Sequence, residues 1–272
     1  MSEWAQMRSR RDPSGSSSGS AIAASIGLAL GVLAAETSGS IVLPSEHNNV
    51  VGIKPTLGLM SRSTVIPISL RQDTVGPVAR TVKDAAYILS VISGKDKFDN
   101  GTDAQPFDEI PDYVKACKYS AFSGARLGIP RNGITPFVNQ STEPIMAAFE
   151  TAVELIRGAA ATVVDEANFA SFDIDAFGRN SSILLGTDFV AQLSDYLSQL
   201  TKNPNNVHNL HGTRYDPREE WPDRDIYAWD RELERNYTNE SEESYDAYQA
   251  NLEMAGPSAS LALSTNTTSM PW

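Results

Sequence analysis

Two short serine- and glycine-rich stretches contain the residue types that could support nucleophilic chemistry. The first, "PSGSSSGSAIAAS" at residues 13–25, holds six serines and two glycines. Its composition is typical of a flexible linker. However, the stretch runs directly into the apolar segment "AIAASIGLALGVLAAE", which linkers seldom do. Composition alone therefore leaves open whether residues 13–25 form a tether or part of a site.

The second stretch, "ETSGSI" at residues 36–41, has the composition of a small turn that could bind an anion. A serine nucleophile needs a proton acceptor, and it needs donors aimed at the oxyanion that develops on the attacked carbonyl. Successive backbone N–H groups in a turn of Thr37, Ser38 and Gly39 can converge on one anion. Ser40 places a hydroxyl beside them. Ordinary turns after strands share this composition, so the turn alone does not establish chemistry.

Taken together, the two stretches resemble the amidase signature family of serine hydrolases. That family reads Gly-Gly-Ser-Ser-Gly-Gly-Ser, then a small-residue helix, a strand and Asp-Thr-Gly-Gly-Ser-Ile; this chain has "SGSSSGS" at 14–20 and "ETSGSI" at 36–41. Ser16 and Ser40 are 24 residues apart, which is the family's spacing. Further matches follow in order at 50–62, 72–89 and 124–132. The segments "SEWA" and "GSSSGSA" are similar to a fungal-type branch of the family.

The resemblance implies a role for each matching residue. Ser40 matches the nucleophile that forms the acyl-enzyme, and Ser16 matches the bridging serine that passes a proton between the nucleophile and a lysine. A cis peptide bond is implied between Gly15 and Ser16, and Ser17 would support the network by hydrogen bonding. The implied oxyanion hole consists of the N–H groups of Thr37, Ser38, Gly39 and Ser40.

Four other serines need separate interpretations. Ser14 and Ser38 stand where the family has glycine, or at Ser38 glycine or aspartate. Neither change removes a backbone N–H, but the Cβ of Ser38 would be strained if that position needed a positive φ. We expect Ser18 and Ser20 to serve close packing and helix capping.

The family's catalytic lysine has no counterpart in this sequence. In the family it lies upstream of the bridging serine, whereas none of the 15 residues before Ser16 is a lysine. The first lysine, Lys54, lies in "GIKPT", a separate family motif in which a structural role is expected. The sequence is therefore interpreted as an amidase-like chain that is truncated at both ends. Three functions stay open: an active amidase, a catalytically impaired or inactive amidase-like fragment, and a non-catalytic α/β binding module.

The pattern of apolar residues predicts an α/β fold, and the resemblance specifies a mixed β-sheet sandwiched by helices. Residues 20–27 are expected to form a fully buried helix, and residues 28–36 a buried strand. Thr81 and Asp84 have the spacing of a capping box for a helix that ends at Gly94. The order of strand, helix and strand in "GARLGIP", 143–160 and "ATVVDEANF" predicts a βαβ unit.

The resemblance covers the whole chain as one partial amidase domain, residues 1–272. Its signature core is predicted at 13–90 and its second part at 124–272. The polar, Pro/Gly-rich residues at about 95–123 are expected to connect the two parts over the surface.

Composition and charge limit the classes of partner. Of the 272 residues, 41% are hydrophobic and 21% charged, which is ordinary for a globular protein. The formal net charge is -12, and residues 90–272, with 14 basic and 28 acidic residues, carry the excess of negative charge, which argues against nucleic acid and anionic membranes. A small-molecule amide is the expected partner, with no membrane span and no cofactor, and the sequence does not indicate an oligomeric state. His208 and His211 are interpreted as part of a polar loop, and no metal site is predicted.

The location of the protein in the cell is not specified by the sequence. The N-terminus "MSEWAQMRSRRDP" lacks the apolar core of a signal peptide. The cytoplasm is therefore the default expectation, and secretion is the alternative if a segment precedes Met1.

Overall fold

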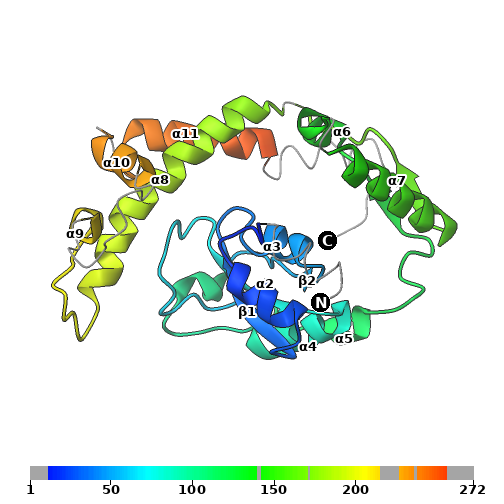
Figure 1. Cartoon of the computed structure of the whole chain (residues 1–272), viewed down its shortest axis with the longest axis horizontal. Coiled ribbons are helices and arrows are strands. Elements are labelled where there is room, and N and C mark those ends of the chain that lie inside the picture. Colours follow the sequence, from blue (N-terminus) through cyan, green and yellow to red (C-terminus); the bar gives the residue numbers. More distant parts are fainter. Residues whose placement is uncertain (1–11, 140–141, 171, 215–226, 236–237, 256–272) are drawn as a thin grey trace, which may run out of the picture. The chain divides into compact units, whose positions relative to one another are not determined.

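The computed structural model describes residues 12–139, 142–170, 172–214, 227–235 and 238–255 (Figure 1). Its contacts divide the chain into two compact units, Met1–Lys118 and Tyr119–Trp272. Each unit is described on its own below. Within the described ranges, no helix combines the length and the apolar composition needed to cross a membrane.

The first unit is built on a small antiparallel sheet. Its elements are α2 (Ser18–Ser25), β1 (Gly31–Glu36), α3 (Val42–His47), β2 (Val51–Gly52), β3 (Thr74–Ala79), α4 (Val82–Ile92), η1 (Asn100–Ala104) and α5 (Tyr113–Ala116). The sheet has the strand order β1-β3-β2, with β3 in the centre. Val32 of β1 lies opposite Val78 of β3, which puts alternate residues of the two strands on the same face.

Helices cover the two faces of this sheet. The buried side chains of Ala24, Ala34, Ile41 and Val78 form one cluster, so α2 and the residue before α3 pack against the face that carries Ala34. A Cβ added at Gly31, which belongs to the opposite face, would collide with Ile88 of α4. Since side chains alternate between faces along a strand, α4 covers the other side of the sheet at β1.

The second unit begins with the predicted βαβ motif. Its elements are β4 (Arg126–Gly128), α6 (Arg131–Ile134), η2 (Thr135–Phe137), α7 (Glu143–Gly158), β5 (Thr162–Val164), α8 (Ile174–Ser198), α9 (Leu210–Arg214), α10 (Tyr227–Glu234) and α11 (Glu242–Ala255). Strands β4 and β5 pair in parallel, with Leu127 opposite Val163. The helix α7 connects them, so the βαβ prediction is confirmed.

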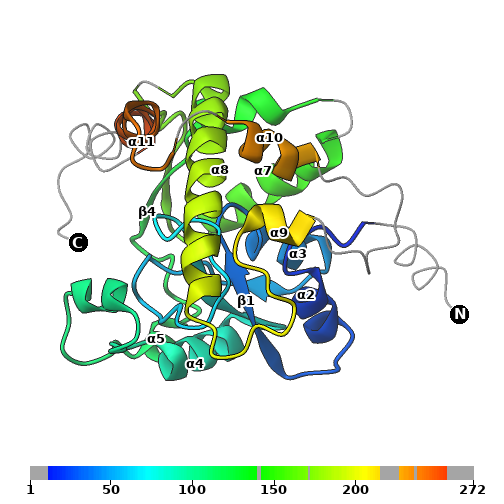
Figure 2. The ribbon, with the colours of Figure 1, turned by 90° about the vertical axis from the view of Figure 1, so that its left-hand side faces the viewer.

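The later part of the second unit is helical. Helix α11 packs along the long helix α8, and Figure 2 shows α11 nearly end-on beside the upright α8. The contact is polar where Thr187 of α8 meets Ser244 of α11, since their buried hydroxyl oxygens lie 2.9 Å apart. Asp173 caps the start of α8 by accepting hydrogen bonds from the N–H groups of Asp175 and Ala176.

The structure confirms one of three predictions of local structure and corrects the bounds and the burial of the other two. The capping box is confirmed, because the hydroxyl of Thr81 accepts a hydrogen bond from the N–H of Asp84 at the start of α4. The helix expected at 20–27 is present, but its bounds and its full burial were wrong: α2 runs from Ser18 to Ser25 and buries only Ala21 and Ala24. The buried strand at 28–36 was wrong in extent and burial, because β1 begins at Gly31 and leaves Leu33 51% exposed.

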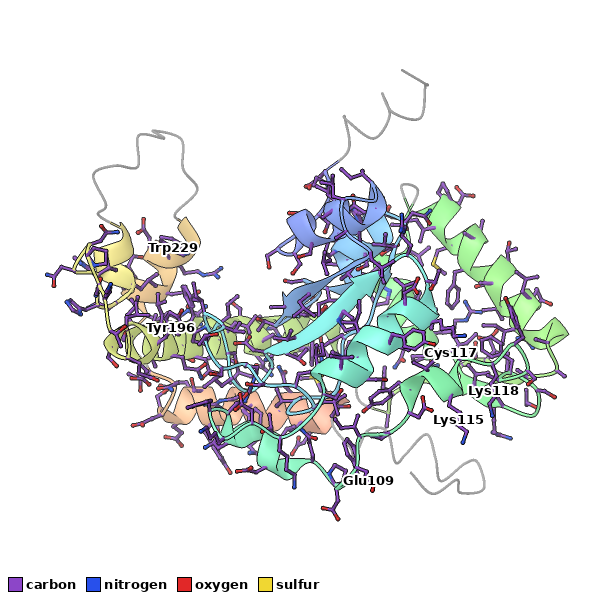
Figure 3. All side chains as sticks on the ribbon, turned by 90° about the horizontal axis from the view of Figure 1, so that it is seen from below. Glu109, Lys115, Cys117, Lys118, Tyr196 and Trp229 are labelled. Atoms are coloured by element: carbon purple, nitrogen blue, oxygen red, sulfur yellow. The ribbon has the colours of Figure 1, made fainter. Side chains whose placement is uncertain are left out.

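The segment expected to run over the surface at 95–123 contains two short helices, and its first part is fixed to the first unit. Thr102 of η1 is completely buried. Asp99 forms a buried ion pair with Arg62, and the side-chain amide of Gln105 donates to the carbonyl of Gly58. Figure 3 marks Lys115, Cys117 and Lys118 at and after α5, where this unit ends.

Candidate active site

The two serine-rich stretches meet in the first unit. The N–H of Ser17 donates to the carbonyl of Ser40 at 3.3 Å. The hydroxyl of Ser17 also donates to the carbonyl of Ala35 (3.0 Å) and accepts from its N–H (3.3 Å). The segment at 13–25 is thus folded against β1 and the turn after it, and it enters α2 at Ser18. A tether would be extended and without such contacts, so that interpretation was wrong.

Ser20 contacts the same strand. Its hydroxyl donates to the carbonyl of Leu33 at 2.8 Å, whereas the N-cap of α2, Ser17, makes no side-chain capping bond. The expected helix-capping role of Ser20 was therefore wrong. Both serines instead bond the outer edge of β1, which pairs with β3 on its other edge.

The backbone before α2 has the unusual conformations that the resemblance led us to expect at Gly15. The peptide bond between Gly15 and Ser16 is cis. Ser14 has a φ of 64°, in the left-handed region that favours glycine. Ser38 does not share this conformation. The positive φ of the turn, 89°, falls on Gly39, so the strain expected at Ser38 is absent.

Replacing Ser14 with glycine is expected to stabilise the protein by about 0.5 kcal/mol, because glycine adopts a positive φ without the Cβ clash that serine incurs. Urea denaturation of the full chain measures this change. Ser38→Gly is the matched control and should give no gain, since Ser38 lies outside the left-handed region. Equal gains at both positions would contradict the assignment of strain to Ser14.

The turn that holds Ser40 presents a row of available donors. The N–H groups of Thr37, Ser38, Gly39 and Ser40 make no hydrogen bond to any described residue. Backbone N–H groups in folded proteins are nearly always paired with protein or water. Ser38 is exposed and the other three residues are half-buried, so none of the four residues lies fully inside the core of the first unit. They belong to the residues for which the resemblance implies an oxyanion hole, and that role stays a prediction.

Packing and hydrogen bonds of the residues that follow the turn hold it in place. Ile41, the residue after Ser40, is completely buried in the core cluster with Ala34 and Val78. The N–H of Leu43 donates to the carbonyl of Gly39 at 2.8 Å. Both neighbours of Ser40 are therefore held: Gly39 by a hydrogen bond and Ile41 by packing in the core of the first unit.

The structure adds two carboxylates that the sequence interpretation missed. Glu36, 4% exposed, accepts hydrogen bonds from the N–H groups of Ile41 and Val42. Asp73, 6% exposed, accepts the hydroxyl hydrogen bond of Thr37 and those of the N–H groups of Ile68 and Ser69. A signal existed for Glu36, because it opens the "ETSGSI" motif. Asp73 is remote in sequence, and only the sheet register brings it close.

The hydrogen bonds of the expected proton path are not formed among the described residues. The hydroxyls of Ser16 and Ser40 make no hydrogen bond to each other or to another described residue. Lys54 is exposed beyond β2, and its side chain makes no hydrogen bond to Ser16 or Ser40. The structural role expected for Lys54 stays a prediction.

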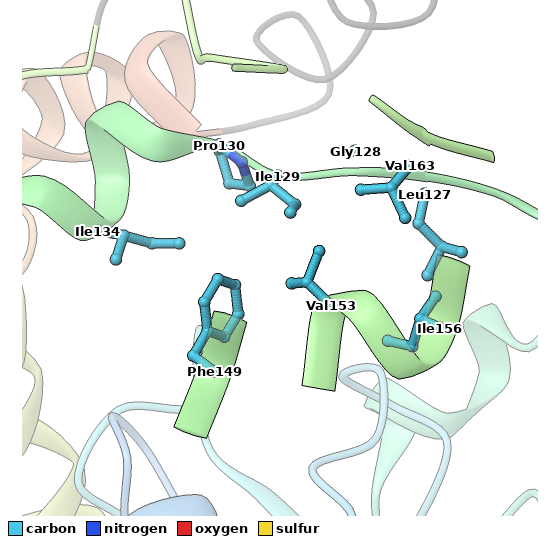
Figure 4. A pocket seen from close by; sticks show the side chains of 9 residues that line it. All are labelled: Leu127, Gly128, Ile129, Pro130, Ile134, Phe149, Val153, Ile156 and Val163. Atoms are coloured by element: carbon cyan, nitrogen blue, oxygen red, sulfur yellow. The ribbon is translucent and has the colours of Figure 1, made fainter. Parts of the chain in front are cut away.

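The second unit contains a cavity that is lined by apolar residues, unlike the polar turn at 37–40 (Figure 4). It has a volume of about 240 Å³ and is lined by Leu127, Gly128, Ile129, Pro130, Ile134, Phe149, Val153, Ile156 and Val163. None of these side chains has a polar group that could orient an amide. The cavity lies between α7 and the β4–β5 pair, and it is the incompletely filled core of the βαβ motif.

His208 and His211, the two histidines considered for metal binding, belong to the second unit. A ring nitrogen of His208 lies 2.8 Å from the side-chain oxygen of Asn206. His208 is thus held by a neighbouring side chain of the same loop, as expected, whereas His211 lies in α9, so the loop interpretation was wrong for His211.

Comparison with known proteins identifies the family. The sequence model of the Amidase family matches residues 6–255. A protein of Arthroderma benhamiae named "Putative amidase" is 46% identical over 247 residues, which cover 89% of this chain and 41% of that protein. The chain therefore belongs to the amidase family.

Solved structures agree with this assignment. The native peptide amidase from Stenotrophomonas maltophilia superposes with a TM-score of 0.79 and 30% identity, over 94% of this chain and 51% of that one. A glutamyl-tRNA(Gln) amidotransferase subunit from Thermotoga maritima gives a TM-score of 0.54 and 29% identity, over 69% and 38% of the two chains. The chain thus has the mixed α/β fold of the family and spans about half the length of these relatives, or less.

Proposed function

We propose that this chain provides the nucleophile and the oxyanion-binding turn of a hydrolase that cleaves a carboxamide C–N bond. The observation that carries the proposal is the turn at 37–40, where four consecutive N–H groups have no acceptor among the described residues and the last of the four belongs to Ser40 itself. Membership of the amidase family and the hydrogen bond from Ser17 to Ser40 support it.

The proposed reaction runs in two stages. The oxygen of Ser40 attacks the amide carbonyl, and the N–H groups of residues 37–40 stabilise the oxyanion that forms. The C–N bond then breaks, the leaving ammonia or amine takes up a proton, and an ester to Ser40 remains. Water attacks this ester through a second oxyanion, releasing the carboxylic acid and restoring the serine. Ser16 would pass the proton between Ser40 and a base, and Gly15 and Ser17 would hold Ser16 in place.

The relatives of known structure indicate which substrates to test. The likeness to the peptide amidase makes peptide amides the first compounds to test. The likeness to the glutamyl-tRNA(Gln) amidotransferase raises an RNA-linked substrate as the alternative. The net charge of -12 disfavours that alternative, since a polyanion would be repelled.

A second candidate function is an amidase-like chain with impaired catalysis. The observation that favours it concerns Lys54, the first lysine of this sequence, which is exposed and makes no hydrogen bond to Ser16 or Ser40. Without the base, only the contributions of the oxyanion hole and of substrate binding would remain.

Labelling with a fluorophosphonate, followed by mass spectrometry of the full chain, distinguishes these functions. We expect one adduct on Ser40, loss of that adduct in Ser40→Ala, and labelling about 100-fold slower in Ser16→Ala, because a positioned proton acceptor contributes at least that much. Ser63→Ala serves as the control and should label like the unchanged chain. Labelling that persists in Ser40→Ala contradicts the proposed nucleophile, and a folded chain that does not label supports the impaired amidase.

A further inference from the structure

We propose that Glu36 is the positioning residue of the candidate site, because its carboxylate fixes the turn that presents Ser40 and the oxyanion donors. The inference rests on the proposed function, in which Ser40 is the nucleophile. Glu36 itself would not touch the substrate. It would act through the backbone of the residues that follow Ser40.

The carboxylate of Glu36 accepts two short hydrogen bonds, and the residue is buried. One carboxylate oxygen, Oε2, accepts from the N–H of Ile41 at 2.7 Å and from the N–H of Val42 at 3.0 Å. The residue is 4% exposed, and Ile41 is completely buried. Hydrogen bonds to a charged acceptor are stronger than neutral ones, and low exposure protects them from competing water.

The two ends of the turn are fixed by this one residue. The backbone of Glu36 ends β1, where it lies opposite Thr74 of β3. The side chain of the same residue holds Ile41 and Val42, at the start of α3. Ile41 is the N-cap of α3 and has no side-chain oxygen, and Glu36 instead accepts from the N–H groups of this N-cap residue and of Val42, the first residue of the helix. Only four residues, 37–40, span the distance between these fixed points.

Glu36 also determines which donors remain for an oxyanion. By accepting the N–H groups of Ile41 and Val42, it removes them from the set that a ligand could use. The available donors are thereby restricted to the turn itself. Without the carboxylate, the backbone after Ser40 would have two further N–H groups without an acceptor, and the turn could rearrange to pair them.

Two variants of Glu36 test the inference in the full chain. Glu36→Ala removes the acceptor and is expected to slow fluorophosphonate labelling of Ser40 by about 100-fold, the size of effect that a misplacement of about 1 Å can produce. Glu36→Gln keeps one carbonyl oxygen that can accept, so it should recover most of the rate. Glu46→Ala and Glu46→Gln are the matched controls on α3, where the exposed Glu46 makes no side-chain hydrogen bond to a described residue; neither should change the rate.

A second measurement separates this inference from the proposed function. Hydrogen–deuterium exchange of the Ile41 and Val42 amides, followed by NMR, should become faster in Glu36→Ala and stay slow in Glu36→Gln. If the unchanged chain does not label, the proposed function fails, and exchange alone then decides whether Glu36 holds the turn. A folded Glu36→Ala that labels at the original rate, or that leaves both amides protected, would overturn the inference. Equal losses of labelling in the alanine and glutamine variants would also overturn it.

Discussion

Replacing Gly76 with alanine is expected to lower the free energy of unfolding by about 3 kcal/mol, at the upper end of what an overpacked core costs. A Cβ at this position would collide with the backbone carbonyl of Ile53 and would come too close to Ile41 and Pro55. Gly76 lies opposite Ala34 in the centre of the sheet, so the strand cannot move away without breaking its pairing. The measurement is urea denaturation of the full chain, followed by circular dichroism.

The collision at Gly76 also involves the candidate site, because Ile41 is the residue after Ser40. A shift of Ile41 would move the turn even in molecules that still fold. Gly19→Ala is the matched control in the same unit. Gly19 lies within α2, and nothing lies within 4 Å of an added Cβ, so this change should stabilise the chain by up to about 1 kcal/mol. A Gly76→Ala variant that stays as stable as the unchanged chain would show that the sheet has more room than the structure indicates.

Removing the carboxylate of Asp99 is expected to cost about 3 kcal/mol, because it leaves the guanidinium of Arg62 buried without its counter-ion. The two side chains are 9% and 7% exposed, and the Nε of Arg62 lies 2.9 Å from the carboxylate of Asp99. The Nη2 of Arg62 donates to the second oxygen at 3.0 Å, so the pair is bidentate. Denaturation of Asp99→Ala measures the loss.

The same pair predicts how stability depends on pH. The hydrogen bonds from Arg62 lower the pKa of Asp99 from 3.8 to about 2, despite its partial burial. A carboxyl group whose pKa is lowered in the folded state contributes its stability above the unfolded value. That contribution, about 2 kcal/mol from a shift of this size, is lost as the pH falls from about 4 toward 2. The difference in stability between the unchanged chain and Asp99→Asn should therefore shrink over this range.

An exposed ion pair provides the control for Asp99. The side chains of Glu154 and Arg157 of α7 are 75% and 40% exposed, and Oε1 of Glu154 lies 3.5 Å from Nε of Arg157. Pairs of this kind contribute little, so Glu154→Ala should change the stability by less than about 0.5 kcal/mol. If the two substitutions had equal effects, burial of the Arg62–Asp99 pair would not be the cause of its strength.

The features predicted correctly from the sequence are those set by local patterns. Residues near one another in the chain predict the capping box at Thr81 and the parallel strands β4 and β5 that α7 connects. The family motif predicts the cis bond before Ser16. The family itself could be identified because two motifs occur at a fixed spacing. The roles of Ser16, Ser40 and the turn at 37–40 stay predictions until labelling tests them.

The features that the sequence did not reveal depend on contacts between distant residues. Asp73 reaches Thr37 only because β3 pairs with β1, and no local pattern indicates that pairing. The ion pair of Arg62 with Asp99 fixes a segment whose Pro/Gly-rich composition suggested a surface connection. The burial of α2 was overestimated because its small residues suggest close packing all around, whereas the sheet covers only one side of the helix.

The serine hydroxyls along β1 have a consequence for how the protein behaves in concentrated solution. An unpaired strand edge offers a row of N–H and carbonyl groups to which a strand of another molecule can add, which is a common start of aggregation. Here Ser17 occupies the N–H and the carbonyl of Ala35, and Ser20 occupies the carbonyl of Leu33, whose side chain is 51% exposed. The stretch with the composition of a linker thus covers part of the edge where a neighbouring strand would pair, and we expect this cover to hinder pairing with another copy of the chain.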